Sequence, residues 1–299
     1  AAAVLRGRTR VERTGGLAIP VAAAALLCNS YGAFDSQVNQ GHMNLNVMGL
    51  QSGFVSPEVL IQAGNHASVA RPPGHIWVVP ALTMNEDSAS DRKHLLGFIQ
   101  LGRIEKLSVV LGMTAEGSPT GLFTSQPPAR MAGPHYQRSI DWMSRGEPGE
   151  GPAIINVSGF RVGVLSGTDI DNPNITRELA NSGVDMVVAA GEEPAEWGLG
   201  LYHQERATKI RACETGRDFA RFGANGPLVV ARPRGHSFPI IGLDEAAWGA
   251  ALLQAREGTT PFREGGWIFP YFVLWVTLAA LLIRLSLGIL KRRGETARS

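Results

Sequence analysis

Residues 160–190 read FRVGVLSGTDIDNPNITRELANSGVDMVVAA, and this stretch decides the class of fold. Residues 160–165 form a short apolar run that is typical of a buried strand. A helix is then predicted to begin at Pro173 and to end at Gly183, and a second apolar strand follows at residues 185–190. A strand, a helix and a strand in this order predict two parallel strands in a mixed α/β domain.

The same alternation of strands and helices continues on both sides of this unit. Short apolar runs between turn residues predict five more strands, at residues 45–48, 76–79, 107–113, 227–231 and 239–243. A second helix is expected over residues 202–215, with Ala207, Ile210 and Cys213 at helical spacing and Gly216 in the capping position. The middle of the chain is therefore expected to be a domain of class α/β.

Two apolar segments lie outside this domain, at residues 17–34 and 267–290. The chain of 299 residues has a net charge of +2, but the charge is unevenly distributed. Residues 1–16 hold +3 and residues 284–299 hold +4, so the region between them is acidic, at about −5. Basic ends around an acidic body favour a membrane as the partner and argue against nucleic acid.

Residues 267–290 are predicted to form a transmembrane helix. The segment contains a single charged residue, Arg284, and is long enough to cross the hydrocarbon core of a bilayer. Aromatic residues crowd its first third and the basic run KRR follows its end, a combination that a buried core helix, the alternative, seldom shows. By the positive-inside rule, the basic tail at residues 291–299 lies in the cytoplasm.

The first apolar segment is shorter in its uninterrupted part, and residues 17–34 are expected to be either a membrane helix or an uncleaved signal anchor. Both alternatives place the basic residues 1–16 in the cytoplasm. A lipoprotein attached at Cys28 is disfavoured, because Leu27 precedes the cysteine where a small residue is expected. We therefore expect a protein of the bacterial inner membrane, with residues 35–265 as an extracytoplasmic domain on the periplasmic side.

A series of short motifs occupies the middle of the chain. In chain order they are Arg161-Val-Gly-Val-Leu165, Pro173, Gly183-Val-Asp-Met-Val-Val188, Trp197-Gly198, His203, Arg211-Ala-Cys-Glu-Thr-Gly-Arg217, Arg221, Asn225-Gly226 and Pro233-Arg-Gly235. This series resembles the carbon–nitrogen hydrolase (nitrilase) superfamily, and is most similar to the C-terminal part of apolipoprotein N-acyltransferase. The resemblance covers residues 150–240 and implies a nitrilase-like αββα sandwich, here with flanking transmembrane helices.

The resemblance also implies a catalytic site, but the reactive residues of that site are missing. Superfamily members use a cysteine nucleophile, a glutamate general base and a lysine that stabilises the oxyanion. Gly167 stands in the cysteine position, Ala81 in the glutamate position and Arg138 in the lysine position. These three vestigial positions are expected to pack together in the fold. We therefore expect no catalytic residue, no bound cofactor and no metal.

Few groups are available as substitutes. Ser166 is next to the vacant position, and Asp169 stands in the place of a family glutamate. A serine nucleophile needs a base within hydrogen-bond reach, and the seven histidines show no motif spacing. Ser166 is therefore interpreted as the cap of the following turn, and Cys213 as a small apolar residue inside a helix.

The resulting hypothesis is a pseudoenzyme: a catalytically inactive nitrilase-like or N-acyltransferase-like membrane protein that acts as a structural or accessory subunit of a larger membrane complex. Its partners would be the lipid bilayer and other membrane protein subunits, in a respiratory or photosynthetic complex for example. Thr277, Ala280, Ser286 and Gly288 are the small or polar residues through which the C-terminal helix would contact partner helices. The alternative is an active membrane-bound N-acyltransferase or amidase with a non-standard site.

Overall fold

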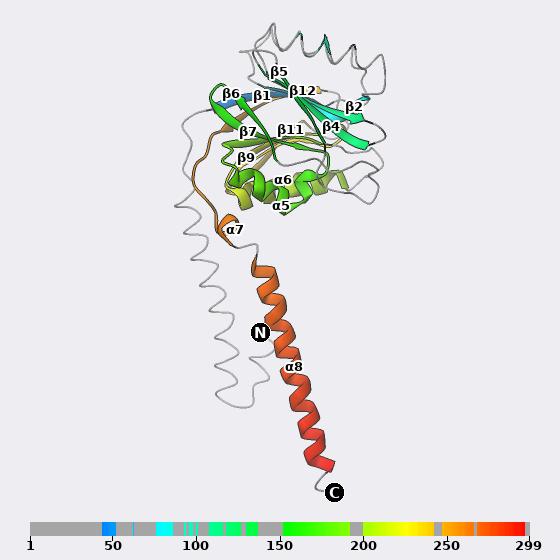
Figure 1. Cartoon of the computed structure of the whole chain (residues 1–299), viewed down its shortest axis with the longest axis vertical. Coiled ribbons are helices and arrows are strands. Elements are labelled where there is room, and N and C mark those ends of the chain that lie inside the picture. Colours follow the sequence, from blue (N-terminus) through cyan, green and yellow to red (C-terminus); the bar gives the residue numbers. More distant parts are fainter. Residues whose placement is uncertain are drawn as a thin grey trace.

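The computed structural model shows two stacked β-sheets, a layer of helices against one of them, and a long C-terminal helix that projects away from the domain (Figure 1). It describes residues 44–51, 76–85, 108–115, 118–126, 130–136, 152–191, 200–241, 247–265 and 268–296, together with Gln62, Lys93, Leu96, Gly97 and Gln100. The predictions made for residues 1–16 and 17–34, for Cys28 and for Arg138 lie outside these residues.

Each sheet contains six strands. Sheet A has the order β12-β1-β2-β3-β4-β5, with the bounds β1 Asn44–Gln51, β2 Ile76–Asn85, β3 Ser108–Ala115, β4 Ser118–Gln126, β5 Arg130–Tyr136 and β12 Ala247–Gln254. Sheet B has the order β11-β10-β9-β8-β7-β6, with the bounds β6 Ala153–Val157, β7 Phe160–Ser166, β8 Met186–Ala190, β9 Asp218–Phe222, β10 Leu228–Ala231 and β11 Ser237–Ile241. In both sheets three neighbouring strands run parallel, β1 to β3 and β7 to β9, and antiparallel strands flank them.

The strand–helix–strand unit predicted at residues 160–190 is confirmed. Strands β7 and β8 pair in parallel, and the helix α5 (Pro173–Asn181) lies between them in the chain. α5 begins where predicted because proline is preorganised for the first turn, and the Asn172 side chain accepts a hydrogen bond of 3.0 Å from the Asn174 N–H. It ends before Gly183, whose φ of +78° stops the helix.

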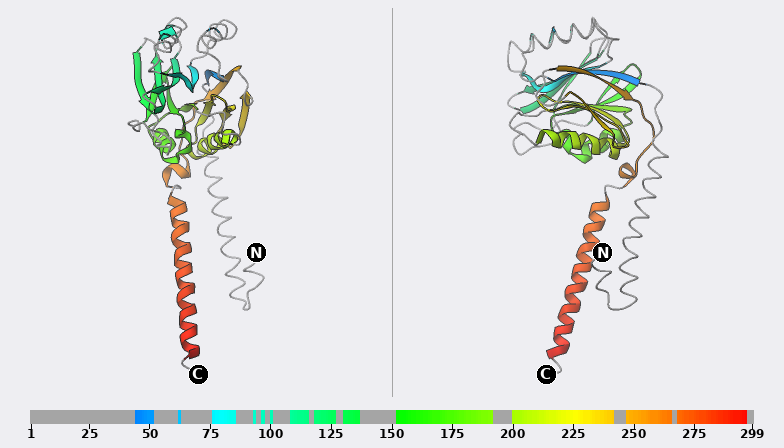
Figure 2. Two further views of the ribbon diagram at one scale, coloured as in Figure 1. Left: turned by 90° about the vertical axis from the view of Figure 1, so that its right-hand side faces the viewer. Right: turned by 180° about the vertical axis from the view of Figure 1, so that it is seen from behind.

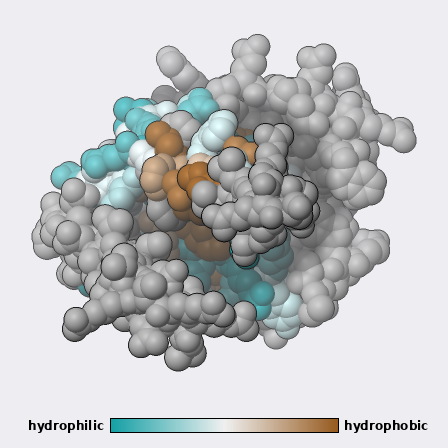
Figure 3. Space-filling view, turned by 90° about the horizontal axis from the view of Figure 1, so that it is seen from below, coloured by the Kyte–Doolittle hydropathy of each residue, from teal (hydrophilic) through white to brown (hydrophobic). Residues whose placement is uncertain are grey.

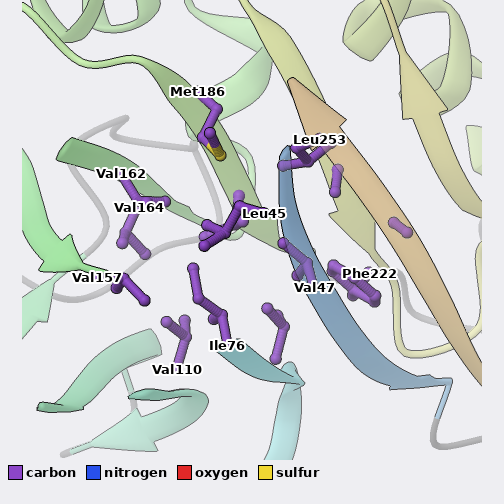
Figure 4. Close-up of a cluster of buried hydrophobic side chains, with 14 of the residues drawn as sticks. Leu45, Val47, Ile76, Val110, Val157, Val162, Val164, Met186, Phe222 and Leu253 are labelled. Carbon is purple, nitrogen blue, oxygen red and sulfur yellow. The ribbon is translucent and has the colours of Figure 1, made fainter. Parts of the chain in front are cut away.

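Apolar side chains from both sheets fill the space between them (Figure 4). Sheet A contributes Leu45, Val47, Ile76, Val110 and Leu253, and sheet B contributes Val157, Val162, Val164, Met186 and Phe222. Sheet contact is closest at Phe222, because a Cβ atom added to Gly49 would lie 1.8 Å from the Phe222 ring. No side chain therefore fits at Gly49 without displacing this ring.

The helices α5 and α6 (Gly200–Thr215) pack on the other face of sheet B. Ile175 and Leu179 of α5 are buried against this face, and a Cβ atom added to Gly163 of β7 would lie 2.6 Å from the Leu179 side chain. Helix, sheet and sheet are three layers of the expected αββα sandwich. Its fourth layer falls outside the described residues.

Two predicted strand boundaries need correction. β2 continues beyond Pro80 to Asn85, and a shift in its register against β3 between Val79 and Met84 accommodates a proline that has no N–H to donate. β11 begins at residue 237 rather than 239, because the Arg232 N–H bonds the His236 carbonyl at 2.8 Å and closes the turn earlier.

The predicted apolar face of α6 is wrong in part. Ala207 is buried as expected, but Cys213 is only partly buried and Ile210 is 50% exposed. The helix instead buries the polar side chains of Gln204 and Thr208. The side of α6 that faces the sheet therefore combines the small apolar residues Ala207 and Ala212 with polar side chains, and lacks the large aliphatic residue that the periodicity predicted.

The chain leaves β12 through a short helix, α7 (Pro261–Glu264), and enters α8 (Phe269–Thr296), which stands clear of the domain in both further views (Figure 2). The apolar side chains of α8 are exposed, for example Trp275 at 71% and Leu282 at 63%. Among the residues described, no helix is both long enough and apolar enough to cross a membrane.

Candidate active site

The candidate site lies where β7 ends. Gly167 directly follows this strand and is buried, with a φ of +53° in the left-handed region. Its N–H donates a hydrogen bond of 2.9 Å to the Ala190 carbonyl, which holds the turn against the end of β8. A side chain at this position would sit at the carboxyl end of a parallel strand, where α/β folds place their reactive groups.

A single turn of 3-10 helix, η1 (Asp169–Asp171), follows Gly167 and leads into α5. Asp169 is 4% exposed and Ile170 is fully buried, so the turn is packed into the domain. Arg211 and Gln204, both from α6, then fix its position.

Arg211 of α6 holds η1 by its backbone. Its guanidinium donates from Nε to the Ile170 carbonyl at 3.0 Å and from a terminal nitrogen to the Asp171 carbonyl at 3.2 Å. The other terminal nitrogen pairs with the Glu214 carboxylate one turn further along α6. Because a planar guanidinium donates in several fixed directions, one arginine joins α6 to two successive carbonyls of η1.

The side chain of Asp171 is the acceptor at the centre of the site. Gln204 donates from Nε2 to one carboxylate oxygen at 2.7 Å, and His203 Nε2 lies 3.5 Å from the other oxygen. Both donors are in the first turns of α6. The His203 side chain is 69% exposed, so this contact lies at the solvent edge of the site, whereas Gln204 is 2% exposed.

Arg221 of β9 lies beneath this cluster and is fully buried. Burial lowers the pKa of Arg221 to about 9, and the negative charge of Asp171 raises it in part. Replacing either Arg221 or Asp171 would be destabilising, because the other charge would then be unpaired in a medium of low dielectric constant.

Solved structures of other proteins share this arrangement of strands and helices. An amidase from Nesterenkonia sp. AN1, solved as a double mutant in complex with acrylamide, is 14% identical, with a TM-score of 0.56 over 74% of this chain and 93% of the amidase. A single mutant of the same amidase, described as from the nitrilase superfamily, is 14% identical, with a TM-score of 0.56 over 76% of this chain and 94% of that chain. This chain has the nitrilase fold. No protein-family model matches the sequence, and neither does any curated protein.

A third structure of that amidase identifies the chemistry that the neighbour performs. It records covalent addition of the acetamide moiety of fluoroacetamide at an active-site cysteine; identity is 15%, with a TM-score of 0.55 over 76% of this chain and 94% of that chain. In this chain the two cysteines are Cys28 and Cys213, and neither stands at the end of β7.

Cys213 lies on α6, away from the turn at Gly167. Its thiol is partly buried, and this burial raises the thiol's pKa, although the Lys209 ammonium lowers it in part. A cysteine in these surroundings is mostly a neutral thiol near pH 7. Because the thiolate is the reactive form, such a thiol is a weak nucleophile.

The three positions that the sequence predicts as vestigial are described to different extents. Gly167 is fully described, Ala81 lies in the extended backbone of β2 with its side chain outside the described residues, and Arg138 lies outside them altogether. The expected packing of Gly167 against Ala81 and Arg138 therefore stays a prediction. β2 does pack across β8, the strand next to β7, and across β9 beyond it.

Ser166 is buried at the end of β7. By the alternation of side chains along β7, Ser166 lies on the same side as Val162 and Val164, which face the space between the sheets. Leu165, between them, faces the helices. No hydrogen-bond partner of the Ser166 hydroxyl lies among the described residues. The carboxylate and imidazole of Asp171 and His203 are held by α6 on the helix side of sheet B, so they do not form a triad with this serine.

Sequence reasoning singled out His203, Arg211 and Arg221 but missed Gln204 and Asp171. A usable signal for Gln204 was present, because it stands one residue after a motif histidine and one turn before Thr208, on the same side of the helix. For Asp171 the only signal was its position directly before the helix-capping Asn172.

Proposed function

We propose that this chain is a membrane-anchored protein of nitrilase fold that does not perform cysteine-dependent amide chemistry and acts as a structural or accessory subunit of a larger membrane assembly. The observation that carries the proposal is Gly167. The turn after β7 retains the left-handed backbone and the packing against β8, but offers a hydrogen atom where a nucleophile is needed.

The remaining chemistry of the turn is structural. Arg211 and Gln204 direct their hydrogen bonds to η1, and the buried Arg221 is within the electrostatic influence of Asp171. With alanine at position 81, the sequence also lacks the carboxylate that would accept a proton. A fold can be kept when its chemistry is gone, because function is carried by the site and not by the fold.

Membrane anchoring is supported by the sequence and exposure of α8. Its described side chains cover residues 271–286, about 24 Å of helix, whereas the apolar sequence extends over residues 267–290, about 36 Å. The longer stretch exceeds the hydrocarbon thickness of roughly 30 Å. Exposed apolar side chains over four turns would be unfavourable in water, and bilayer or partner helices would cover them.

The side chains of α8 also bear on how it would meet a partner. The hydroxyls of Thr277 and Ser286 donate to the carbonyls of Val273 and Leu282 in the same helix, at 2.8 and 2.9 Å. Contact with a partner helix would then depend on close packing at small residues rather than on these hydroxyls.

Catalysis is tested with the purified full chain in mild detergent, with both cysteines intact, and a variant carrying Cys28→Ser and Cys213→Ser is measured in parallel so that any fluoroacetamide adduct can be assigned to a cysteine or to another residue. We expect no ammonia release from acrylamide or butyramide, no transfer from a phospholipid acyl donor to a peptide amine, and no change in intact mass after fluoroacetamide treatment. The Nesterenkonia amidase, assayed in parallel, is the positive control for the amide substrates. An acyl-enzyme that forms here and disappears in Ser166→Ala would establish the alternative, an active amidase or N-acyltransferase.

Anchoring and assembly are tested in the native membrane. Single cysteines at Ser118 and Ser299 should be labelled from the periplasmic and the cytoplasmic side, respectively. Pull-down of the full chain in mild detergent should recover a fixed set of membrane subunits in constant ratio. Labelling of position 118 from the cytoplasm contradicts the orientation, and recovery of the chain by itself contradicts the accessory role.

A further inference from the structure

The segment between β12 and α8 is fastened to the domain by arginines. Arg256 forms a buried ion pair with Asp218 at the start of β9. Arg217 and Arg263 both donate to the Gly258 carbonyl, at 3.1 and 2.9 Å. Arg263 also donates to the Ala180 carbonyl at the end of α5, at 3.0 Å, where a cation meets the negative end of the helix dipole.

Because this segment is held against the domain, it determines which face of the domain is directed toward α8. Only four residues, 265–268, separate α7 from α8. α5 and α6 form the layer of the domain on the side from which α8 projects, and α6 runs across the direction of α8 (Figures 1 and 2). The side of α6 that turns away from sheet B therefore faces the region that α8 enters.

That side of α6 carries one stripe of apolar and basic residues. Tyr202, Arg206 and Ile210 follow one another at intervals of four positions, and Lys209 lies three positions after Arg206; all four are exposed, Tyr202 at 47% and Ile210 at 50%. We call these four residues the α6 stripe. None of the four enters the hydrogen bonds that hold η1, so their exposure has no explanation in the candidate active site.

A second basic element lies beside the stripe. A Cβ atom added to Gly235 would lie 3.7 Å from Lys209 Cε, so the turn that contains Gly235 packs against Lys209. The neighbouring residue in that turn, Arg234, is exposed. Among the described residues of α5 and α6, the acids are Glu178, which is exposed on α5, Glu205, which is partly buried at the margin of α6, and Glu214, which pairs with Arg211. Seen from below, the brown apolar surface of α8 is bordered by hydrophilic, teal surface of the described domain (Figure 3).

We propose that the α6 stripe binds the anionic headgroups of the bilayer that α8 enters, so that the domain rests on the membrane surface in one orientation. This inference depends on the membrane anchoring proposed above. Tyrosine is favoured at headgroup depth because its ring is apolar and its hydroxyl polar. Arginine and lysine are attracted to anionic headgroups within a Debye length of the surface, and a short connection to α8 keeps them within that distance.

The test measures the accessibility of Lys209 with the full chain in lipid nanodiscs. Acetylation by an amine-reactive ester is quantified by mass spectrometry at Lys209 and at the exposed Lys93, which lies between β2 and β3. In nanodiscs with one third phosphatidylglycerol, Lys209 should react at least threefold more slowly than in pure phosphatidylcholine, and 0.5 M salt should abolish the difference. Lys93 should react equally in both.

Variants separate the causes of protection. Arg206→Glu should remove the protection of Lys209 by phosphatidylglycerol, whereas Lys93→Glu, the same change of charge outside the stripe, should leave it intact. Equal acetylation of Lys209 in both lipids, in a chain that is retained in the nanodiscs, overturns the headgroup contact alone. A chain that does not enter nanodiscs at all overturns the membrane anchoring as well.

Discussion

The helices α5 and α6 lie side by side on the same sheet, but different interactions hold them there. α5 buries aliphatic side chains such as Leu179, at the spacing that apolar periodicity predicts. α6 buries Gln204 and Thr208 and directs Arg211 into the domain, while Ile210 points to solvent. Apolar periodicity therefore finds the buried face of a helix that packs with large aliphatic side chains, but places in part wrongly the buried face of a helix that packs with small and polar ones.

The polar contacts of α6 also explain why a nitrilase-like motif remains in this chain. Arg211 and Glu214 position the turn after Gly167, and Arg217 fastens the start of the segment toward α8. These residues stabilise the fold whether or not a nucleophile is present. Their retention is therefore compatible with an inactive site, and the comparison of α5 with α6 can be tested by substitution.

The largest effect is expected on α5. Leu179→Ala should lower the free energy of unfolding by about 3 kcal/mol, because the side chain is buried against Gly163 and its removal leaves a cavity. Ile210→Ala on α6, a similar loss of volume at an exposed position, should change it by less than about 0.5 kcal/mol. Urea denaturation of the full chain in detergent measures both. Equal losses would show that both helices are packed by apolar contacts.

The next largest loss of stability is expected when Arg211 of α6 is replaced. Arg211→Lys keeps the charge but loses the geometry that reaches the Ile170 and Asp171 carbonyls together, so unfolding should become easier by about 2 kcal/mol. Arg206→Lys, the same substitution on the exposed side of α6, is the matched control and should be close to neutral. If the two variants have the same stability, the Arg211 guanidinium does not hold η1 in place.

A smaller loss is expected at the vacant nucleophile position. Gly167→Ala should cost roughly 1 kcal/mol, since an alanine must adopt the left-handed φ of +53°. Ser166→Ala removes a hydroxyl without a partner among the described residues and should leave stability almost unchanged. Thermal unfolding of the two variants in the same detergent distinguishes them, and a stabilised Gly167→Ala would mean that the turn relaxes to another conformation.

The smallest effect concerns the thiol on α6. Because burial raises the pKa of Cys213, its thiolate is scarce near pH 8 in the folded chain and grows as pH rises beyond 9. In a Cys28→Ser background, iodoacetamide should alkylate native Cys213 at pH 8 more slowly than in urea, because a smaller fraction of the thiol is ionised. The difference between the native rate and the rate in urea should become smaller above pH 9. A native rate equal to the rate in urea would show that this side of α6 is solvent-exposed.

The parts of the fold that the sequence predicts are those where local signals agree. A buried apolar strand, a proline at a helix start and a glycine at its end place β7, α5 and β8 closely. The strands β4 and β5 were missed, since glycine, serine, threonine and proline within them read as turn residues. There the pairing between neighbouring strands, which is not local, determines the extended backbone.

The position of the turn after β7 was predictable from the sequence, but the contacts that support it were not. The glycine after β7 could be located because its strand is unmistakable. The contact of Gln204 with Asp171 joins residues 33 positions apart, and the contact of Arg263 with Ala180 joins residues 83 positions apart. Such pairs depend on how helices dock on the sheet, and a single sequence carries no periodic signal for them.

The fastened segment before α8 also determines how the protein would bear mechanical load. A pull on α8 reaches Arg263 first, then Gly258 and the pair between Arg256 and Asp218. Because these contacts follow one another along one short segment, each must open before the load passes to the next. β12, the outermost strand of sheet A, is thereby shielded from being peeled away from β1 along its eight paired residues. The domain can be held by its C-terminal end without unravelling from that end.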